Sequence, residues 1–494
     1  MHQDRSLYEA LYPGTIRHRF LKGLGANSVG QIINLATQVL LPPLFLGAWG
    51  ADVYGEWLVL SSFVAYLSLT DMGGQKYIVN RLTQAYAQQD FSLFRRVLHT
   101  GLAIFLFMPT AVFFLFTAAV LIVPPKSILP ILKTDHQVVV WVLAILAFQF
   151  VFSLPQGILL GIYRAVGLLP RGAMLANLIQ FLQLALMAAA LWLGSGMVLI
   201  AGLQMLPYPL VALIAVWDLN RRFPQFSLLS LKGAEYSTGL AFVKPSLHFL
   251  SIQITQTFSI QGMILVVAAA LPPIQVVVFS TTRTMVASMR QLLALIAITA
   301  WPEMTRLDAQ QDVDGLYTLF RAVLRSSLLL AAVLASIFHF FGATIYHLWL
   351  GGEVEYEQVI MDLFLVYFLQ LVFWLTCSYL LASTNRHHTL SKILLAASAL
   401  TIVLALVGGR YFGLQGVIIG MIVGDLILPF WCVPYLLNRY QARFSLPFFL
   451  KETAAVIVGV TSIIFLPWLA PITFLLLLSW WIASLLPIAT LERS

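Results

Sequence analysis

The chain has 494 residues, of which 60% are hydrophobic and 10% are charged, and its mean hydropathy is +0.90. Soluble globular domains have about a quarter of their residues charged, so this composition excludes a soluble protein and indicates a polytopic membrane protein. The formal net charge of +8 requires no nucleic-acid partner, because basic residues gather in the cytoplasmic loops of membrane proteins.

Apolar stretches recur along the whole chain. Each has roughly 17–27 residues, which is enough to cross a bilayer core of about 30 Å. The predicted fold is therefore an all-α polytopic membrane protein with about fourteen transmembrane helices. In chain order these are 24–48, 54–74, 97–123, 138–161, 173–193, 198–217, 241–268, 275–300, 323–348, 359–382, 391–409, 414–434, 452–468 and 472–490.

The basic residues are unevenly distributed over the loops between these spans. If the N-terminus faces the cytoplasm, 23 Lys and Arg residues fall in cytoplasmic segments, 3 fall in outer segments and 2 lie inside a span. An imbalance of this size is the positive-inside pattern. We therefore predict that both termini are cytoplasmic and that the acidic loop Gly351–Gln358 lies outside.

Two similar stretches indicate an internal repeat. "LLGIYRAVGLLPRGAMLANL" (159–178) and "LLASTNRHHTLSKILLAASA" (380–399) each surround a short basic loop between two spans, 221 residues apart. Because the two sets of six spans begin on the same side, the repeat is parallel. The predicted domains are a basic, amphipathic cytoplasmic N-terminus (1–23), an N-terminal lobe of six helices (24–217), a cytoplasmic linker (218–240), a pseudo-symmetric C-terminal lobe of six helices (241–434), and a final helix pair with a cytoplasmic tail (435–494).

Two spans carry polar faces. In the first span, amide side chains recur at spacings of four, three and four, so they share one helix face. These residues are Asn27, Gln31, Asn34 and Gln38. The seventh span carries His248, Gln253, Gln256 and Gln261. Lipid would leave such groups unsatisfied, so they face protein or water. Hydrogen bonds between helices would explain both faces, as would a polar cavity between the lobes. If a polar cavity is the explanation, the candidate substrate-binding residues are Asn27, Gln31, Asn34, Gln38, Gln253 and Gln256.

The eighth span contains two arginines, Arg283 and Arg290. They are seven residues apart, so they lie about 10.5 Å apart along one face of a helix. Each arginine at mid-bilayer costs about 2.5–3.5 kcal/mol, so this face needs a polar environment. Arginine grips carboxylate or phosphate in a bidentate way, which suggests a pyrophosphate or an acidic sugar as the ligand. The alternatives are snorkelling, structural ion pairs with Asp425 or another acid, and misplaced span boundaries.

Asp425 is the one carboxylate near the middle of a span. An intramembrane acid is a candidate for coupling to H⁺ or Na⁺, and it could equally be a partner for an arginine or a cap at a helix break beside Gly424. His248, His339 and His347 could carry protons, although each fits a bonded or interfacial role better. Glu303 is expected to pair with Arg306 or with a loop arginine.

Enzyme motifs are absent from the sequence. It holds no Walker glycine loop, no HExxH and no GxSxG, and the acids Glu353, Glu355 and Glu357 of the outer loop do not form the paired-carboxylate motif that a membrane glycosyltransferase would need. We therefore predict that the chain is not an enzyme and has no cofactor. A membrane-embedded glycosyltransferase or polymerase would need a large outer loop with acidic residues, and a non-transporting scaffold would not need a charged helix face.

The stretch "LGAWGADVYGEWLVLSSFVAYLSLTDMGGQKYIVNRL" (46–82) resembles the first hairpin of bacterial polysaccharide exporters, the lipid-linked oligosaccharide flippases of the MOP superfamily. The turn "ADVYGEW" and the Asp-x-Gly at Asp71 and Gly73 carry this resemblance. "FSTTRT" (279–284) and "WPEMTRL" (301–307) resemble the eighth span and following loop of that group. The relatives that flip the peptidoglycan precursor have arginines in their first two spans, and this chain has none between Lys22 and Lys76.

The resemblance implies a two-lobed, MATE-like transporter of the bacterial inner membrane. Its substrate would be an undecaprenyl-pyrophosphate-linked oligosaccharide for O-antigen or exopolysaccharide, with Arg283 and Arg290 on the pyrophosphate. Implied partners are membrane lipids and polysaccharide polymerase or assembly proteins, and no nucleic acid. The main rival is an ion-coupled multidrug antiporter of the same superfamily, which should carry carboxylates in the cavity of its N-terminal lobe. None is visible there, since Glu56 and Asp71 lie at the ends of spans.

Overall fold

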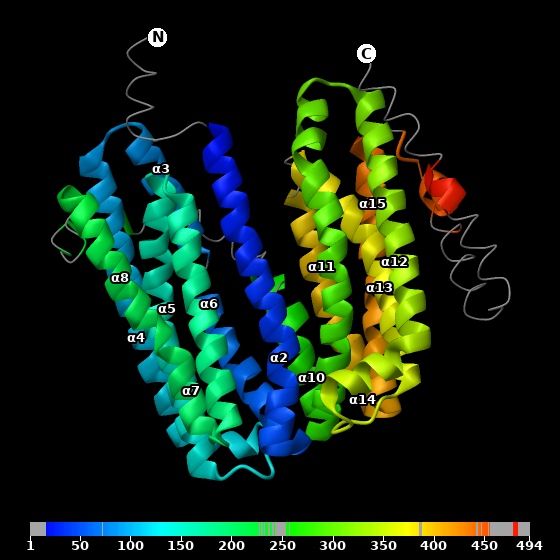
Figure 1. Ribbon diagram of the computed structural model, residues 1–494, viewed down its shortest axis with the longest axis horizontal. Helices are drawn as coiled ribbons and strands as arrows, with labels where there is room; N and C mark the ends of the chain where they lie inside the picture. Colours follow the sequence, from blue (N-terminus) through cyan, green and yellow to red (C-terminus); the bar gives the residue numbers. More distant parts are fainter. Residues whose placement is uncertain are drawn as a thin grey trace. The chain divides into compact units, whose positions relative to one another are not determined.

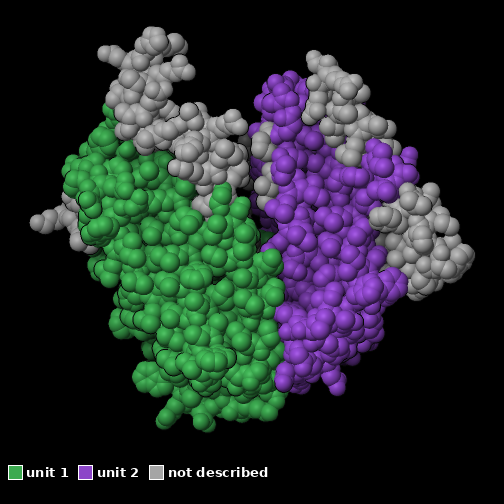
Figure 2. Space-filling model, in the orientation of Figure 1, with its two compact units in different colours: residues 1–257 green, residues 258–494 purple. Residues whose placement is uncertain are grey.

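The computed structural model describes residues 16–71, 73–226, 228, 231, 233–235, 238–239, 242, 253–255, 257–384, 388–440, 443–445, 447–452, 454 and 478–482. The elements of these residues are all helical (Figure 1). They form two compact units, Met1–Thr257 and Phe258–Ser494, which Figure 2 colours separately.

Ten helices among the described residues are long and apolar enough to cross a membrane. Two of them, Ser28–Ala87 and Thr389–Tyr440, each cover two predicted spans, so the ten account for the first twelve predicted spans. The prediction of an all-α, multi-pass membrane protein is confirmed. The final pair, 452–468 and 472–490, lies almost wholly outside the described residues.

Unit 1 is organised around one central helix, α5. It contacts α2, α3, α4, α6, α7 and α8. Its face toward α3 and α4 belongs to a buried apolar core that includes Ile158 and Ile162. The elements of the unit are α2 (Ile16–Ala65), η1 (Tyr66–Asp71), α3 (Gly74–Ala87), α4 (Phe91–Ile122), η2 (Pro125–Ser127), α5 (His136–Ala165), α6 (Leu169–Trp192), α7 (Met197–Met205), α8 (Pro207–Arg222) and η3 (Pro224–Phe226).

Unit 2 has the same organisation around α13, which contacts α11, α12, α14 and α15. α5 and α13 are the fourth predicted spans of their halves, so each half packs around its fourth predicted span. The internal repeat itself stays a prediction. The elements are η4, a single π-helical turn (Phe258–Gly262), α10 (Met263–Ala270), α11 (Pro273–Ala309), α12 (Val313–Leu350), α13 (Gln358–Ser383), α14 (His388–Ile427) and α15 (Pro429–Tyr440).

The units adjoin in sequence at Thr257 and Phe258, inside the predicted seventh span. The short stretch 253–255 is tied to unit 1 because the Gln253 amide nitrogen donates to the Ser68 carbonyl at 2.6 Å. Most residues between 227 and 252 lie outside the described part of the chain, so the domain boundaries at 217/218 and 240/241 stay a prediction.

A buried ion pair fastens the C-terminal described segments to α12. Arg325 donates from Nε and Nη2 to the two oxygens of the Glu452 carboxylate, both at 2.8 Å, and from Nη1 to the Trp480 carbonyl at 2.8 Å. Its guanidinium lies over the Trp480 ring, 4.5 Å from the centroid. Arg325 and Glu452 are only 2% and 1% exposed. These contacts satisfy both charges locally, as burial in a low-dielectric interior requires.

Glycine joins two consecutive spans within each of the long helices α2 and α14. Gly50 has φ 72° and ψ 171°, and Gly413 has φ 62° and ψ −148°. These backbone conformations are essentially restricted to glycine, because a Cβ would clash with the neighbouring carbonyl. The two glycines therefore let one membrane span end and the next begin without a loop.

Replacing Gly50 by alanine is expected to destabilise the protein by about 1–3 kcal/mol, since alanine is strained in this backbone conformation. Thermal unfolding in detergent measures the effect. Gly47→Ala is the matched control: Gly47 lies in the same helix, and a Cβ there would meet no atom within 4 Å. The control should be neutral or slightly stabilising, since alanine favours a helix. Equal melting temperatures for the two variants would contradict the prediction.

Candidate functional site

The two intramembrane arginines lie on α11, the predicted eighth span. Helical backbone over the whole of 273–309 places them two turns apart on one face, as the spacing predicts. Arg283 is half-buried and Arg290 is exposed. No carboxylate among the described residues forms an ion pair with either arginine. The described residues therefore offer no acid for the alternative explanation, in which the arginines form structural ion pairs.

The Arg283 guanidinium is held in place by its surroundings in unit 2. Its Nη1 donates to the Ile260 carbonyl at 2.7 Å, and its Cζ lies 5.3 Å from the centroid of the Phe279 ring. Ile260 belongs to the π-helical turn η4, and such a turn shifts the backbone hydrogen-bond register at a site that is often functional. Among the described residues, Ile260 accepts from one of the five N–H groups of Arg283, and an anion could accept from the other four.

Two tyrosines of α13 lie near the arginines. Tyr367 interacts electrostatically with Arg283, Arg290 and Asp425, and Tyr379 interacts with Arg290. Neither tyrosine is among the site residues predicted from the sequence. A signal was present, because Tyr367, Gln370 and Trp374 recur at spacings of three and four on one face of an otherwise apolar span. A phenolic hydroxyl can donate to phosphate or to a sugar oxygen, so Tyr367 and Tyr379 extend the candidate anion site.

Asp425 lies in the second part of α14 and is 7% exposed. Its Oδ2 accepts a hydrogen bond from the Trp374 indole Nε1 at 3.1 Å. One helical turn away, the Gln370 amide donates to the Ile422 carbonyl at 2.9 Å, which fixes α13 against α14. Within the described residues, Asp425 has no ion-pair partner. It is a buried acid with one neutral hydrogen-bond donor.

The predicted amide face of the first span lies on α2. Gln31 and Asn34 are exposed and Gln38 is half-buried, with the Gln38 Nε2 donating to the Asn34 Oδ1 at 2.5 Å. A Cβ on Gly30 would meet the Asn177 side chain, so a neighbouring face of α2 packs on α6. The Asn27 side chain lies outside the described part of the chain. These residues belong to unit 1, and their substrate-binding role stays a prediction.

Two residues of the seventh-span face, His248 and Gln256, lie outside the described residues. Gln253 is described, and its amide nitrogen is committed to the Ser68 carbonyl. Its amide oxygen accepts no hydrogen bond from the described residues. The role of Gln253 and Gln256 in substrate binding stays a prediction.

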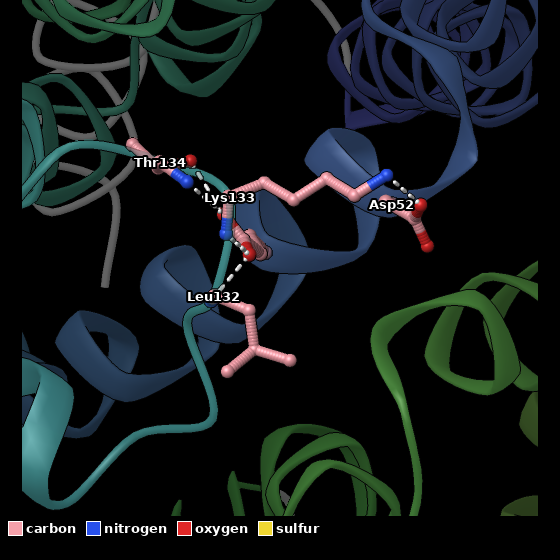
Figure 3. Close-up of polar contacts among 5 residues, drawn as sticks. Asp52, Leu132, Lys133 and Thr134 are labelled. Atoms are coloured by element: carbon pink, nitrogen blue, oxygen red, sulfur yellow. Dashed lines mark hydrogen bonds and ion pairs between the residues drawn. The ribbon is translucent and has the colours of Figure 1, made fainter.

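Unit 1 contains a buried acid, Glu56, near the start of the second span. Its Oε1 accepts from the backbone N–H groups of Leu132 and Lys133, both at 2.7 Å, and its Oε2 accepts from the N–H of Thr134 at 2.9 Å and from the Thr134 hydroxyl (Figure 3). The ammonium group of Lys133 forms an ion pair with the Asp52 carboxylate, and this hydrogen bond raises the pKa of Lys133. Glu56 is 0% exposed, and both of its carboxylate oxygens accept hydrogen bonds from residues 132–134. It is a structural anchor rather than a free carboxylate.

Replacing Glu56 by glutamine is expected to destabilise the protein by about 2–3 kcal/mol. The new amide group would place N–H donors against the converging N–H donors of the loop and leave at least one of them unsatisfied. Asp52→Asn is the control: its ion pair with Lys133 is exposed and should be worth less than about 1 kcal/mol. Thermal unfolding of both variants measures the difference. A control that is as destabilised as Glu56→Gln would contradict this assignment.

The other described acids of unit 1 also lie at helix ends or in loops. Asp218, in the last turn of α8, binds Arg171 at 2.7 Å, Arg222 at 2.9 Å and the Tyr163 hydroxyl at 2.8 Å. Asp71 accepts a hydrogen bond from the Gln75 backbone N–H at 3.1 Å. Asp90 and Asp135 directly precede α4 and α5, and Glu235 lies in a loop. The described part of unit 1 therefore offers no free carboxylate in the middle of a span.

Two further predicted contacts can be located in unit 2. Glu303 pairs with Arg306 one turn later, which confirms the expected local pairing. His339 of α12 binds the Asp362 carboxylate of α13 at 2.7 Å, which fits the bonded role predicted for it. His347 is exposed and contacts the Tyr346 ring.

Searches for similar proteins find the same architecture in solved structures. No protein-family model and no curated protein matches the chain. The lipid II flippase MurJ in its inward closed conformation matches with a TM-score of 0.68 at 12% identity, over 95% of this chain and 99% of that chain. An inward-facing MATE family multidrug transporter of the MOP superfamily matches with a TM-score of 0.66 at 15% identity, over 84% and 94%. An outward-facing MATE family multidrug transporter of the MOP superfamily matches with a TM-score of 0.56 at 14% identity, over 86% and 95%. These structures are of transporters and a flippase, not of enzymes, and the chain has the fold that MATE transporters and MurJ share.

Proposed function

We propose that the chain is a flippase of the bacterial cytoplasmic membrane. It would move undecaprenyl-pyrophosphate-linked oligosaccharide units from the inner to the outer leaflet, for O-antigen or exopolysaccharide biosynthesis. The observation that carries this proposal is the arginine pair: Arg283 and Arg290 lie two turns apart inside a membrane-spanning helix, and no described carboxylate neutralises them.

The chemistry of the pair fits a pyrophosphate. Two guanidinium groups in a membrane are stabilised by an anion with several oxygens, and arginine binds such oxygens in a bidentate way. Tyr367 and Tyr379 add hydroxyl groups near Arg290. Amide side chains suit sugar hydroxyls because each both donates and accepts hydrogen bonds. We assign this role to Asn27, Gln31, Asn34, Gln38, Gln253 and Gln256.

The mechanism would be alternating access by two six-helix lobes, with the headgroup in a polar path and the polyprenyl tail in lipid. Asp425 is the proposed site of coupling to H⁺ or Na⁺, because it is the described mid-span acid without an ion-pair partner. Both termini would be cytoplasmic, and polysaccharide polymerase or assembly proteins would receive the product.

A second candidate is an ion-coupled multidrug antiporter, which is favoured by the likeness to MATE family transporters. Such a transporter would bind organic cations and would need carboxylates to do so. In the described part of unit 1, each carboxylate lies at a helix end or in a loop. The arginine pair of α11 would repel a cation, so we favour the flippase.

Leaflet exchange in liposomes tests the proposal. The purified protein is reconstituted with a fluorescent polyprenyl-diphosphate oligosaccharide, and a membrane-impermeant quencher reports the outer leaflet. Uptake of a cationic dye is measured in parallel. We expect lipid exchange without dye uptake. Dye uptake driven by an ion gradient, without lipid exchange, would assign the protein to the antiporter class.

A further inference from the structure

Asp218 gathers two arginines in unit 1, where α5, α6 and α8 contact one another. Asp218 is 4% exposed, and its Oδ1 accepts from the Nη2 of Arg171 at 2.7 Å and from the Nε of Arg222 at 2.9 Å. Its Oδ2 accepts from the Tyr163 hydroxyl at 2.8 Å. Because both arginines bind one oxygen atom, their guanidinium groups lie beside each other, although they come from α6 and α8. One carboxylate balances one of the two positive charges, so the cluster keeps a net positive charge.

A tight turn between α5 and α6 fixes the position of Arg171. Gly167 has φ 79°, and the Leu168 N–H donates to the Tyr163 carbonyl at 2.6 Å, which closes the turn. A Cβ on Gly172 would lie 2.9 Å from the Tyr163 Cβ, so α6 begins directly against the last turn of α5. The two guanidinium groups are therefore held in place before any ligand arrives, which lowers the cost of binding one.

Both guanidinium groups stay accessible to a ligand. The side chains of Arg171 and Arg222 are 47% and 43% exposed. Each gives one N–H group to Asp218, and the described residues accept from none of the other four. Guanidinium groups match the oxygens of a phosphate in geometry and charge, so one phosphate could accept from both arginines.

A stripe of exposed side chains on α8 leads to this cluster. Its members recur at spacings of three, four and four, so they share one helix face. They are Leu210, Leu213, Trp217 and Arg221. The Cζ of Arg221 lies 5.8 Å from the centroid of the Trp217 ring. The stripe thus changes along the helix from apolar to aromatic to cationic, which is the order of acyl chain, interface and headgroup in one leaflet of a membrane.

We propose that the cluster and the stripe form one binding site for an anionic phospholipid, at the predicted cytoplasmic end of α8. The phosphate accepts from Arg171 and Arg222, Arg221 adds a third positive charge, and an acyl chain lies along the apolar part of the stripe. Three arginines and one carboxylate leave two positive charges, which favours an anionic headgroup over a zwitterionic one. Basic clusters between helices on the cytoplasmic side suit the headgroups of anionic lipids. None of these residues belongs to the proposed substrate site, so the inference does not depend on the proposed function.

Native mass spectrometry of the full chain tests the site. The delipidated protein in detergent is titrated with phosphatidylglycerol or with phosphatidylcholine, and the dissociation constant of the first bound lipid is measured. We expect the wild type to bind phosphatidylglycerol about 10-fold more tightly, because its headgroup leaves no second charge to oppose the arginines. Arg171→Gln and Arg222→Gln should lose this preference. Arg221→Gln leaves every contact of Asp218 in place and should weaken the binding of phosphatidylglycerol about fivefold.

Arg95→Gln is the matched control. Arg95 is another exposed arginine of unit 1, in the first turns of α4 on the predicted cytoplasmic side, and it lies outside the cluster. This variant should bind phosphatidylglycerol as tightly as the wild type. Trp217 reports where the acyl chain lies. Phosphatidylglycerol with brominated chains should quench tryptophan fluorescence more than brominated phosphatidylcholine does, and Trp217→Phe should lose this excess.

Four results would overturn the proposal. Equal affinity for the two phospholipids, or an effect of Arg95→Gln as large as that of Arg222→Gln, would reduce the arginines to a general surface charge. An unchanged excess of quenching in Trp217→Phe would place the lipid away from the stripe. Displacement of the brominated lipid by inorganic phosphate would indicate a phosphate site that takes no lipid. Displacement by farnesyl diphosphate at a lower concentration than by unbrominated phosphatidylglycerol would assign the site to a polyprenyl-diphosphate lipid instead.

Discussion

Replacing Arg290 by glutamine is expected to slow the exchange of a polyprenyl-diphosphate oligosaccharide between leaflets by about 10- to 100-fold. A hydrogen bond to a charged group contributes about 1.5–3 kcal/mol, and each 1.4 kcal/mol corresponds to a factor of ten. Arg290 is exposed, and the described residues give it no hydrogen-bond or ion-pair partner, so the variant breaks no described hydrogen bond or ion pair. Leaflet exchange in liposomes, normalised to the amount of folded protein, measures the effect.

The companion variants distinguish an anion site from a general effect of lost charge. Arg283→Gln should also slow exchange, and it should lower thermal stability as well, because Arg283 donates to the Ile260 carbonyl. Arg290→Lys keeps the charge but loses bidentate geometry, so its rate should fall between those of the wild type and Arg290→Gln. Arg410→Gln removes an exposed arginine from the predicted outer side and is the control. Equal exchange rates for Arg290→Gln and Arg410→Gln would refute the role of Arg290.

Replacing Glu452 by glutamine is expected to destabilise the protein by about 3–5 kcal/mol. Removal of one partner from a buried ion pair leaves the other charge uncompensated, and Arg325 is almost wholly enclosed. Arg321, whose Nε lies 3.4 Å from the Glu452 carboxylate, would lose its partner as well. A large fall in melting temperature, measured in detergent, would confirm the prediction.

The control for Glu452 is the exposed pair of Glu303 and Arg306. It has the same chemistry in a solvated setting, so Glu303→Gln should change stability by less than about 1 kcal/mol. The double variant Arg325→Met/Glu452→Met provides a second check. An apolar replacement of both partners should recover part of the stability that Glu452→Gln loses. If the single and double variants were equally unstable, the ion pair would not be the source of the effect.

The helical architecture could be predicted from the sequence because it depends on local and additive properties. A bilayer excludes unpaired backbone groups, so an apolar stretch of sufficient length must form a helix. For this reason the first twelve predicted spans agree with the described helices. Gly50 and Gly413 lie in the predicted gaps 49–53 and 410–413 between spans, but the sequence did not predict that a single glycine would replace a loop there, because the residue type alone does not give its φ.

The sequence by itself determined that the chain crosses a membrane many times, that Arg283 and Arg290 share a helix face, and that Asp425 is a mid-span acid. Only the tertiary structure decided the partners of these groups: the Ile260 carbonyl for Arg283 and the Trp374 indole for Asp425. It also assigned Glu56 to a loop 76 residues further along the chain. The physical reason is that periodicity fixes which residues share a face, whereas the identity of a facing partner depends on packing between helices that are distant in sequence.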